Sequence, residues 1–273
     1  MSKVIAALDN SLAARPVVAA ATALAQLLGA EVEALHVGEN GNGVAANAAA
    51  AAGLELSTCG GPAVARLVEA GSSEDVVAMV VGSRGMPGRA RPVGATALEV
   101  LAALPKPLLV VQPETTPRPL RRLLVPLEGT LPTSAAPEAI LEVADGFELD
   151  VVVLHVHDEA SIPLFNDQRQ HETREWAREF VARYCPWGVA DVQLETRVGR
   201  RDEEILRAAD EFDADLIALG WAQELAPGRA PVVRAVLERG HVPVLLVPVS
   251  TDAAMATSVP KEESWSSWPS LRV

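Results

Sequence analysis

The stretch VVAMVVGSRG, residues 76–85, decides the fold because it passes from a continuous apolar run into a glycine loop. An apolar run without polar alternation is typical of a strand that is buried on both faces, as in a parallel sheet. The loop continues to residue 96 as GSRGMPGRARPVGAT, with four glycines, three arginines and two prolines. A helical pattern begins at Thr96, so the loop connects a buried strand to a helix.

Strand and helix patterns alternate on both sides of this loop. The strands predicted in the first half are Val4–Leu8, Glu31–Val37, Glu55–Thr58, Val76–Val81 and Pro107–Gln112. The helices predicted there are Arg15–Leu28, residues 44–52, Ala63–Ala70 and Thr96–Ala103. This alternation predicts a doubly wound α/β fold. Aromatic residues make up only 4% of the chain, so the core must consist of Ala, Val and Leu.

The second half of the chain repeats the first. The matching segments are VIAALDNS (4–11) with LLVPLEGT (123–130), AEVEALHV (30–37) with LDVVVLHV (149–156), VAMVVGSRG (77–85) with ADLIALGWA (214–222), and VLAALPKPLLVVQP (100–113) with VLERGHVPVLLVPV (236–249). The offset is 119 residues between His36 and His155 and grows to 138 between Gly82 and Gly220. The second copy therefore contains an insertion, which we expect to be mostly one helix within 164–185.

Composition shifts divide the chain further. We expect a first domain at 1–112, a linker at 113–119, a second domain at 120–249 and a C-terminal tail at 250–273. The linker is indicated by its three prolines and two threonines. The tail contains Trp265 and Trp268, which we expect to anchor it on this chain or on a protein partner, including a second copy of the chain.

Charge and composition exclude several classes of protein. A formal net charge of −13 argues against nucleic-acid binding, which generally needs a basic face. The apolar stretch Val17–Val37 is interrupted by Gln26 and Glu31, so no membrane span is expected. Cys59 and Cys185 are the only cysteines and lie far apart, which is typical of the reducing cytoplasm.

The sequence offers no candidate catalytic residues. No paired acid and base defines a reaction, so we expect no enzyme activity, and a slow ATPase ranks last among the alternatives. His155 and His157 lie two apart on a strand end, but spacing places no third ligand beside them. We therefore expect no metal site.

The order and spacing of these motifs resemble the universal stress protein family. The motifs are Asp-x-Ser at 9–11, LHV at 35–37, and the segment GSRG…G…VL…PLLVV from residue 82. The resemblance covers both halves and implies two doubly wound five-stranded parallel-sheet domains, each with strand order 3-2-1-4-5. It also implies that the apolar edge strands PLLVVQP (107–113) and PVLLVPV (243–249) pair with each other, giving an intrachain pseudo-dimer.

The resemblance implies a nucleotide site where the first and fourth strands diverge. In ATP-binding members an Asp and the backbone at the end of the second strand help to hold the nucleoside, and a G-x2-G-x9-G-(S/T) loop wraps the phosphates. The site residues that this implies are Asp9, Val37, Gly82, Arg84, Gly85, Gly94 and Thr96, with ATP and Mg²⁺ as the ligand.

The first copy departs from that pattern at the end of the loop. Only eight residues separate Gly85 from Gly94, and Ala95 stands where a hydroxyl is expected, one place before Thr96. The alternative is an ordinary strand-to-helix loop, in which Asp9, Asn10 or Ser11 caps the first helix and Thr96 the next.

The second copy departs further. Glu128 replaces the Asp, Gln223 replaces the second glycine, and Ala230 and Pro231 replace the last glycine and the hydroxyl. Proline removes an N–H donor from the cradle, and Trp221 either fills the adenine slot or packs beside it. We therefore expect a stress-related regulatory protein with at most one nucleotide site, in the first half. The alternative is a scaffold or adaptor that binds a protein and no nucleotide.

Overall fold

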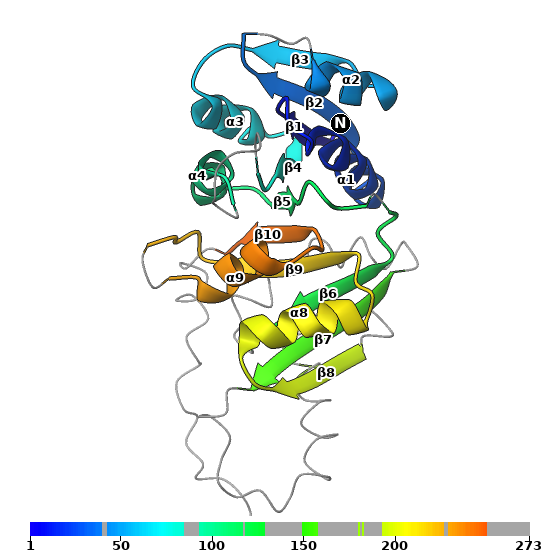
Figure 1. Cartoon of the computed structure of the whole chain (residues 1–273), viewed down its shortest axis with the longest axis vertical. Coiled ribbons are helices and arrows are strands. Elements are labelled where there is room, and N and C mark those ends of the chain that lie inside the picture. The colour runs from blue at the N-terminus through cyan, green and yellow to red at the C-terminus, as the bar shows by residue number, and fades with distance from the viewer. Residues whose placement is uncertain are drawn as a thin grey trace, which may run out of the picture.

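The computed structural model describes residues 1–39, 43–84, 93–116, 118–128, 149–157, 180, 182, 193–226 and 229–249. Within these residues, ten strands form one sheet in the order β3-β2-β1-β4-β5-β10-β9-β6-β7-β8, with six helices packed on its faces (Figure 1). The fold is α/β, as the alternation of strand and helix patterns predicts.

The first half supplies five strands and four helices. They are β1 (Lys3–Leu8), α1 (Ala14–Leu27), β2 (Glu31–Val37), α2 (Val44–Ala51), β3 (Leu56–Cys59), α3 (Ala63–Gly71), β4 (Val76–Gly82), α4 (Ala95–Ala103) and β5 (Leu108–Val111). Each strand and helix predicted in this half is present, with bounds that differ by at most one residue.

The second half repeats this arrangement within the described residues. Its elements are β6 (Arg122–Pro126), β7 (Asp150–His157), β8 (Gln193–Val198), α8 (Arg201–Glu211), β9 (Leu216–Trp221), α9 (Pro231–Arg239) and β10 (Val244–Pro248). Phe180 and Ala182 are helical, and the remainder of the helix expected within 164–185 lies outside the described residues.

Both halves have the predicted strand order. The first half runs β3-β2-β1-β4-β5, and the second runs β8-β7-β6-β9-β10, which is 3-2-1-4-5 when each half is numbered by itself. All pairs within a half are parallel. The first and fourth strands of each half are therefore neighbours whose connections leave in opposite directions, which creates a topological switch point.

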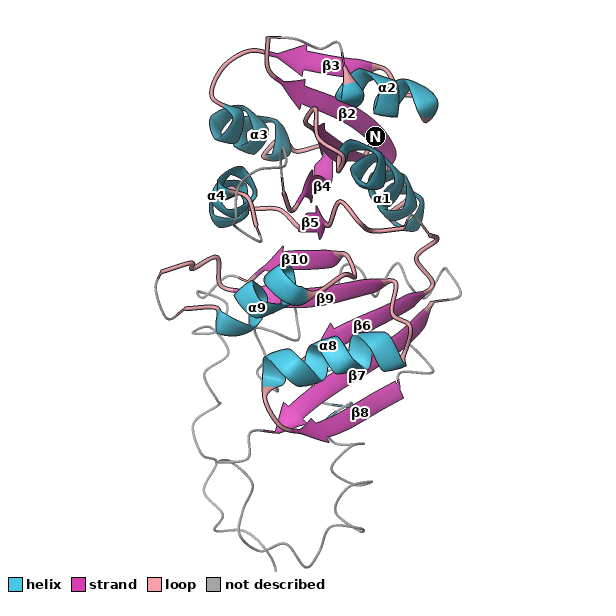
Figure 2. Cartoon of the chain, in the orientation of Figure 1, coloured by secondary structure: helices cyan, strands magenta, loops and turns pink. Residues whose placement is uncertain are grey.

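The two edge strands pair as predicted. β5 and β10 are antiparallel, with Leu109 opposite Leu245 in the middle of the seam. All of β5 and the first four residues of β10 are buried. The sequence thereby covers two apolar edges that would otherwise be exposed to pairing with other chains. Figure 2 shows the strands of both halves following one another through the molecule as one sheet.

Alternation along the strands divides the core into two layers. Val4, Ala6 and Leu8 of β1 face the layer that contains α1 and α2, whereas Ile5 faces the layer that contains α3 and α4. In the second half, α8 and α9 cover the same face as α3 and α4. Alanine lets α1 approach the sheet closely, since Ala14, Ala21 and Ala25 are buried along one side of it.

A glycine marks the end of α1. Gly29, at φ +57°, follows the C-terminus of α1 and adopts the left-handed conformation that glycine tolerates best.

Past β5, the Arg118 guanidinium contacts Asp213 and Asp215. The Asp215 carboxylate also accepts hydrogen bonds from the backbone N–H groups of Arg121 and Arg122, both at 2.9 Å. These contacts hold the start of β6 against the turn that precedes β9.

Candidate functional site

Asp9 and Gly82 lie at the same edge of the first half. β1 and β4 are parallel neighbours whose register pairs Ala7 with Val81, and Asp9 and Gly82 come just beyond that pair. Val37 ends β2, the neighbour of β1 on its other side. The topology therefore brings three of the sequence-predicted site residues to one carboxyl edge of the sheet.

The Asp9 carboxylate organises the turn into α1. Its Oδ1 accepts hydrogen bonds from the Ser11 backbone N–H at 3.1 Å and the Ser11 hydroxyl at 2.5 Å. Ser11 Oγ in turn accepts a hydrogen bond from the Ala13 N–H at 3.2 Å. Asp9 itself is exposed. The interpretation of Asp9, Asn10 or Ser11 as the N-cap of α1 is wrong, because Ala13 occupies that position without a side-chain cap.

Asn10 caps a different helix. Its Oδ1 accepts a hydrogen bond from the backbone N–H of Ala45, in the first turn of α2, at 3.1 Å. The N-cap residue of α2 is Gly43, which has no side chain to supply this bond. Asn10 thus satisfies one of the N–H groups that a helix leaves unpaired at its start, and joins the end of β1 to α2.

Gly82 is required by close packing. A Cβ at this position would lie 2.8 Å from the Cβ of Ala13, the N-cap residue of α1. Such a contact is shorter than real side chains make, and Ala13 has no flexible end that can move aside. Glycine here lets the end of β4 approach the start of α1.

The start of α4 faces the same edge. Gly94 is its N-cap, and no side chain caps it. The interpretation of Thr96 as that cap is therefore wrong, and Thr96 is exposed within the first turn. The Gly94 N–H donates to the Ser83 carbonyl oxygen at 2.7 Å, which closes the loop at its base. Gly85 lies outside the described residues.

Arg84 has a weak partner. Its guanidinium lies 3.8 Å from the Glu114 carboxylate, and both side chains are exposed. An exposed pair at this distance contributes little to stability, so the Arg84 charge is available to an anion at the loop.

Two buried polar side chains beside this edge were not predicted. Ser83 is fully buried and Gln112 is 3% exposed. The Ser83 hydroxyl and both side-chain atoms of Gln112 lack hydrogen-bond partners. The Ser83 backbone N–H donates to the Val111 carbonyl oxygen at 2.7 Å. Ser83 and Gln112 therefore follow the ends of two neighbouring strands, β4 and β5. The sequence signals were the position of Ser83 after the first glycine and of Gln112 at the end of an apolar strand.

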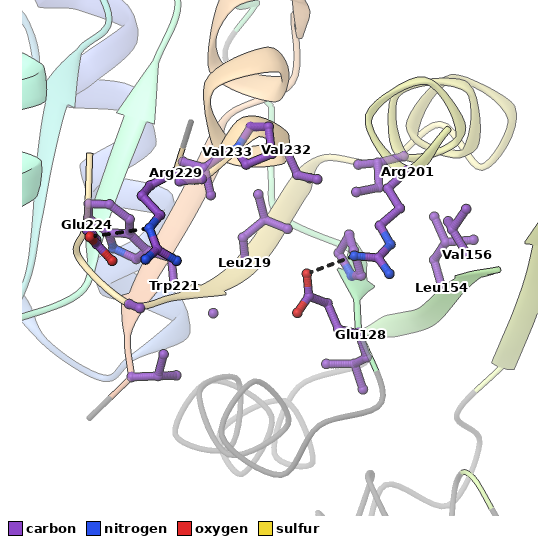
Figure 3. Close-up of a pocket in the computed structure, with 18 residues that line it drawn as sticks. Glu128, Leu154, Val156, Arg201, Leu219, Trp221, Glu224, Arg229, Val232 and Val233 are labelled. Atoms are coloured by element: carbon purple, nitrogen blue, oxygen red, sulfur yellow. Dashed lines mark hydrogen bonds and ion pairs between the residues drawn. The ribbon is translucent and has the colours of Figure 1, made fainter. Parts of the chain in front are cut away.

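The corresponding edge of the second half contains a pocket. Its volume is about 440 Å³, and it lies between the carboxyl ends of β6, β7 and β9 and the first turns of α8 and α9 (Figure 3). Most of the side chains that face it are aliphatic, among them Leu154, Val156, Leu219 and Val233. This volume falls in the range of small-molecule sites.

Two ion pairs line this pocket. Glu128, the counterpart of Asp9, lies 3.4 Å from the guanidinium of Arg201, and Glu224 lies 3.5 Å from that of Arg229. The four side chains are between 47% and 66% exposed, which places the charges at the mouth of the pocket. No spacing in the sequence indicates that Arg201 meets Glu128, because the contact forms only when α8 packs beside β6.

Trp221 lies deeper in the same pocket. It is 4% exposed, and its indole Nε1–H has no hydrogen-bond partner. It occupies the position equivalent to Ser83, so both halves place a buried, unpartnered polar group directly after a glycine near the end of the fourth strand. Of the two interpretations of Trp221, packing beside the crevice is the one the structure favours, since the pocket remains open next to it.

Two residues of the second loop have backbone conformations that glycine adopts more readily. Gln223 and Ala230 replace two glycines of the pattern and have φ values of 55° and 46°, in the left-handed region. Pro231 begins α9 and offers no N–H. Gln223 Nε2 donates across the seam to the Leu104 carbonyl oxygen, at the end of α4, at 2.6 Å. This loop therefore contributes to the joint between the halves.

The repeated histidines serve the same structural purpose in each half. His36 Nδ1 donates to the Leu8 carbonyl oxygen at 2.8 Å, and His155 Nδ1 donates to the Leu127 carbonyl oxygen at 2.9 Å. Burial lowers the pKa of His155 and that of His157, whose rings lie 4.5 Å apart. Among the residues placed by the structure, no cluster of three or more metal-ligating side chains is present.

Known proteins resemble the chain in sequence and in fold. Residues 119–248 match the family model of the Universal stress protein family, so this segment is a universal stress protein domain. A search of curated proteins gave no match.

Among the helices that the structure describes, none is long and apolar enough to cross a membrane.

Three solved structures resemble the chain over both halves. A protein of unknown function from Pseudomonas aeruginosa PAO1 has a TM-score of 0.68 at 17% identity, covering 94% of this chain and 95% of that one. A universal stress protein from Archaeoglobus fulgidus scores 0.66 at 17% identity, covering 90% and 98%. A putative universal stress protein from Pseudomonas aeruginosa UCBPP-PA14 scores 0.67 at 17% identity, covering 94% and 95%. At this identity the likeness shows the fold alone, and it extends across the seam of β5 and β10.

Proposed function

We propose that the chain is a tandem, stress-related regulatory protein of the cytoplasm that binds one adenine nucleotide, ATP with Mg²⁺, in its first half. The proposal keeps the division into domains at 1–112 and 120–249, a linker at 113–119 and a tail at 250–273. The universal stress protein domain at 119–248 and the same strand order in residues 3–111 support the tandem arrangement.

One observation carries the nucleotide assignment. At the carboxyl edge of β1 and β4, an exposed acid, a close-packed glycine, an available arginine and an uncapped helix start lie together. A switch point of this kind is where doubly wound sheets bind ligands. The exposed backbone N–H groups at the start of α4 favour an anion.

Each site residue has a role in this arrangement. Asp9 contacts the nucleoside, and the backbone at Val37 borders the base. Arg84 offers its charge to the phosphates, and the glycines at 82, 85 and 94 let backbone N–H groups approach them. Thr96 adds a hydroxyl in the first turn of α4. In this proposal the nucleotide acts as a regulatory ligand, and the chain is not an enzyme.

We propose that the second half does not bind ATP. Its equivalent edge has Pro231 where a hydroxyl and an N–H are needed, and side chains at Gln223 and Ala230 where glycines belong. The charges at the mouth of its pocket cancel, because each of the two arginines faces a glutamate. A triphosphate would meet no net positive charge there.

Isothermal titration of the full chain with ATP and Mg²⁺ tests this function. We expect one site per chain. Thr96→Ala removes a hydrogen bond to a charged group, whose value of about 1.5–3 kcal/mol corresponds to at least a tenfold weaker Kd. Asp9→Asn is expected to weaken binding, whereas the matched change Glu128→Gln in the second half leaves the Kd unchanged.

Two sites per chain, or a loss of binding in Glu128→Gln, would contradict the assignment. If no nucleotide binds and excess ATP–Mg²⁺ leaves the Tm unchanged, the adaptor alternative replaces it. Under that alternative the chain binds a protein partner or a second copy of itself through the tail. Trp265 and Trp268, the anchors expected there, lie outside the described residues.

A further inference from the structure

The pocket of the second half lies where the described part of the chain ends. It occupies about 440 Å³, and aliphatic side chains such as Leu154, Leu219 and Val233 line it (Figure 3). Val249 lines it too and is the last described residue. The Val249 backbone N–H donates to the Trp221 carbonyl oxygen at 2.9 Å, which holds this residue beside β9. The tail, residues 250–273, therefore leaves the domain at the pocket.

The charges at the mouth of the pocket favour an uncharged occupant. Glu128 with Arg201 and Glu224 with Arg229 form pairs at 3.4 and 3.5 Å. A charged group of either sign would have to break one of these pairs or lie beside a like charge. The gain that the aliphatic walls can offer is the removal of apolar surface from water.

One segment of the tail has this chemistry. Residues 264–271 read SWSSWPSL, with two tryptophans, one leucine and no charged residue. The acidic and basic residues nearest to it, Lys261, Glu262, Glu263 and Arg272, lie outside the segment. A tryptophan ring carries a large apolar area and has only two side-chain torsions to fix, so burying it costs little conformational entropy.

The tail can reach the pocket from its point of departure. At about 3.3–3.6 Å per residue, residues 250–265 span on the order of 50 Å when extended, which leaves ample length for the chain to turn back. A segment tethered this close has an effective concentration on the order of millimolar at the pocket. Even a contact that would be weak between separate molecules is therefore populated within one chain.

A second segment also departs from the pocket. Residues 129–148 follow Glu128, but at the offset of 119 they correspond to the part of the first half that contains α1. α1 packs on the face of the sheet opposite to α3 and α4, whereas the pocket lies on the side of α8 and α9. The repeat thus gives that segment a counterpart elsewhere, and the tail has none.

We propose that residues 264–271 dock in this pocket of their own chain, with a tryptophan ring packed between its aliphatic walls. The docked segment covers the apolar surface of the pocket and closes it to other molecules. This contact goes beyond the proposed nucleotide site, since it lies in the other half and requires no nucleotide.

Fluorine NMR of the full chain labelled with 5-fluorotryptophan tests the proposal. The five tryptophans are assigned by single Trp→Phe variants, and a labelled synthetic peptide of residues 260–273 gives the positions of the undocked rings. We expect the resonance of Trp265 or Trp268 in the native chain to be displaced from its position in the peptide. Val233→Phe fills the pocket and should abolish that displacement, whereas Leu12→Phe, at an exposed site of the first half, should not.

A reciprocal variant tests the pocket without altering its walls. Replacing both tail rings, Trp265→Ser with Trp268→Ser, should displace the resonance of Trp221, which lines the pocket. This change lies in the tail, so it remains informative if Val233→Phe fails to fold by circular dichroism. An unchanged Trp221 resonance overturns the proposal, as do native tail resonances that coincide with those of the peptide or are unaffected in folded Val233→Phe.

Sedimentation at the NMR concentration distinguishes the chain's own tail from that of a second copy. We expect a monomer whose tail resonances do not change on dilution. A dimer whose dissociation returns the resonances of Trp265 and Trp268 to their positions in the peptide would assign the pocket to the tail of a second copy, and would overturn docking within one chain.

Discussion

Replacing Ala230 with glycine should stabilise the protein. Ala230 is the N-cap residue of α9 and has φ 46° and ψ 47°, a left-handed conformation that costs an L-residue about 1–2 kcal/mol. Glycine relieves that cost but gains freedom in the unfolded chain, which takes back about 0.4–1 kcal/mol. The Ala230 methyl group is only half-buried, so little packing is lost. The net expectation is about 0.5–1 kcal/mol of added stability.

Urea unfolding followed by circular dichroism measures this change. We expect a higher midpoint at an unchanged slope, and a Tm about 2 °C higher by calorimetry. Ala222→Gly is the matched control, since it makes the same substitution in the same loop. Within the described chain only Asp213, Gln223 and Ala230 are non-glycine residues with positive φ, so Ala222→Gly should destabilise by about 0.4–1 kcal/mol.

Gln223→Gly should change the stability of the protein little, because two effects oppose each other. Gln223 has φ 55°, but its side chain donates to the Leu104 carbonyl oxygen, so the relief of strain is offset by a lost hydrogen bond. If Ala230→Gly destabilises the protein as much as Ala222→Gly does, the left-handed backbone at Ala230 does not cost the folded state the expected free energy.

Three further changes test other parts of the structure. Gly82→Ala should destabilise by about 1–3 kcal/mol in urea unfolding, because its Cβ meets Ala13, and an unchanged midpoint would argue against the close contact. Asn10→Ala should cost about 1 kcal/mol by removing the side-chain bond to α2, and stronger hydrogen-exchange protection of α2 in the variant would contradict this. Burial lowers the pKa of His155 and His157 below their ordinary 6.5, so the unfolded chain takes up protons first and the free energy of unfolding should fall as pH decreases from 6.5. His157→Gln should reduce that pH dependence, and an equally steep dependence in the variant would refute the cause.

The first of these changes affects the design of binding experiments. Substituting Gly82 with a larger residue such as valine is an obvious way to block the nucleotide site. Because a Cβ at Gly82 meets the rigid start of α1, loss of binding in that variant would report a displaced helix as readily as a blocked pocket. Thr96 is exposed and makes no cap, so Thr96→Ala tests the ligand with less effect on the fold.

Apolar runs and their repetition in the sequence were sufficient to predict the strands, whereas the strand order was implied by the family resemblance. VVAMVVG at 76–82 forms β4 as expected, since a short continuous apolar run suits a strand that is buried on both faces. The pairing of β5 with β10 was also implied by the resemblance, and it covers two apolar edges. The capping residues of helices were predicted less well, because Ala13 and Gly94 are N-caps without a capping side chain, and the pattern of polar residues gave no signal for them.

The candidate sites were less predictable than the fold. Arg201 meets Glu128, and Gln223 meets Leu104, only through packing between segments distant in sequence. The open pocket of the second half depends on which side chains leave space after packing, and the spacing of motifs does not predict that space. The left-handed φ of Ala230 could not be predicted from the sequence either, because alanine rarely adopts this conformation and no residue type there indicates it.

A crystal structure of the full chain grown with ATP and Mg²⁺ would locate the nucleotide. We expect one nucleotide per chain, at the carboxyl edge of β1 and β4, with its phosphates at the start of α4 and Asp9 beside the ribose. Nucleotide in the pocket between β6 and β9, or density at neither edge in saturating ATP, would contradict it.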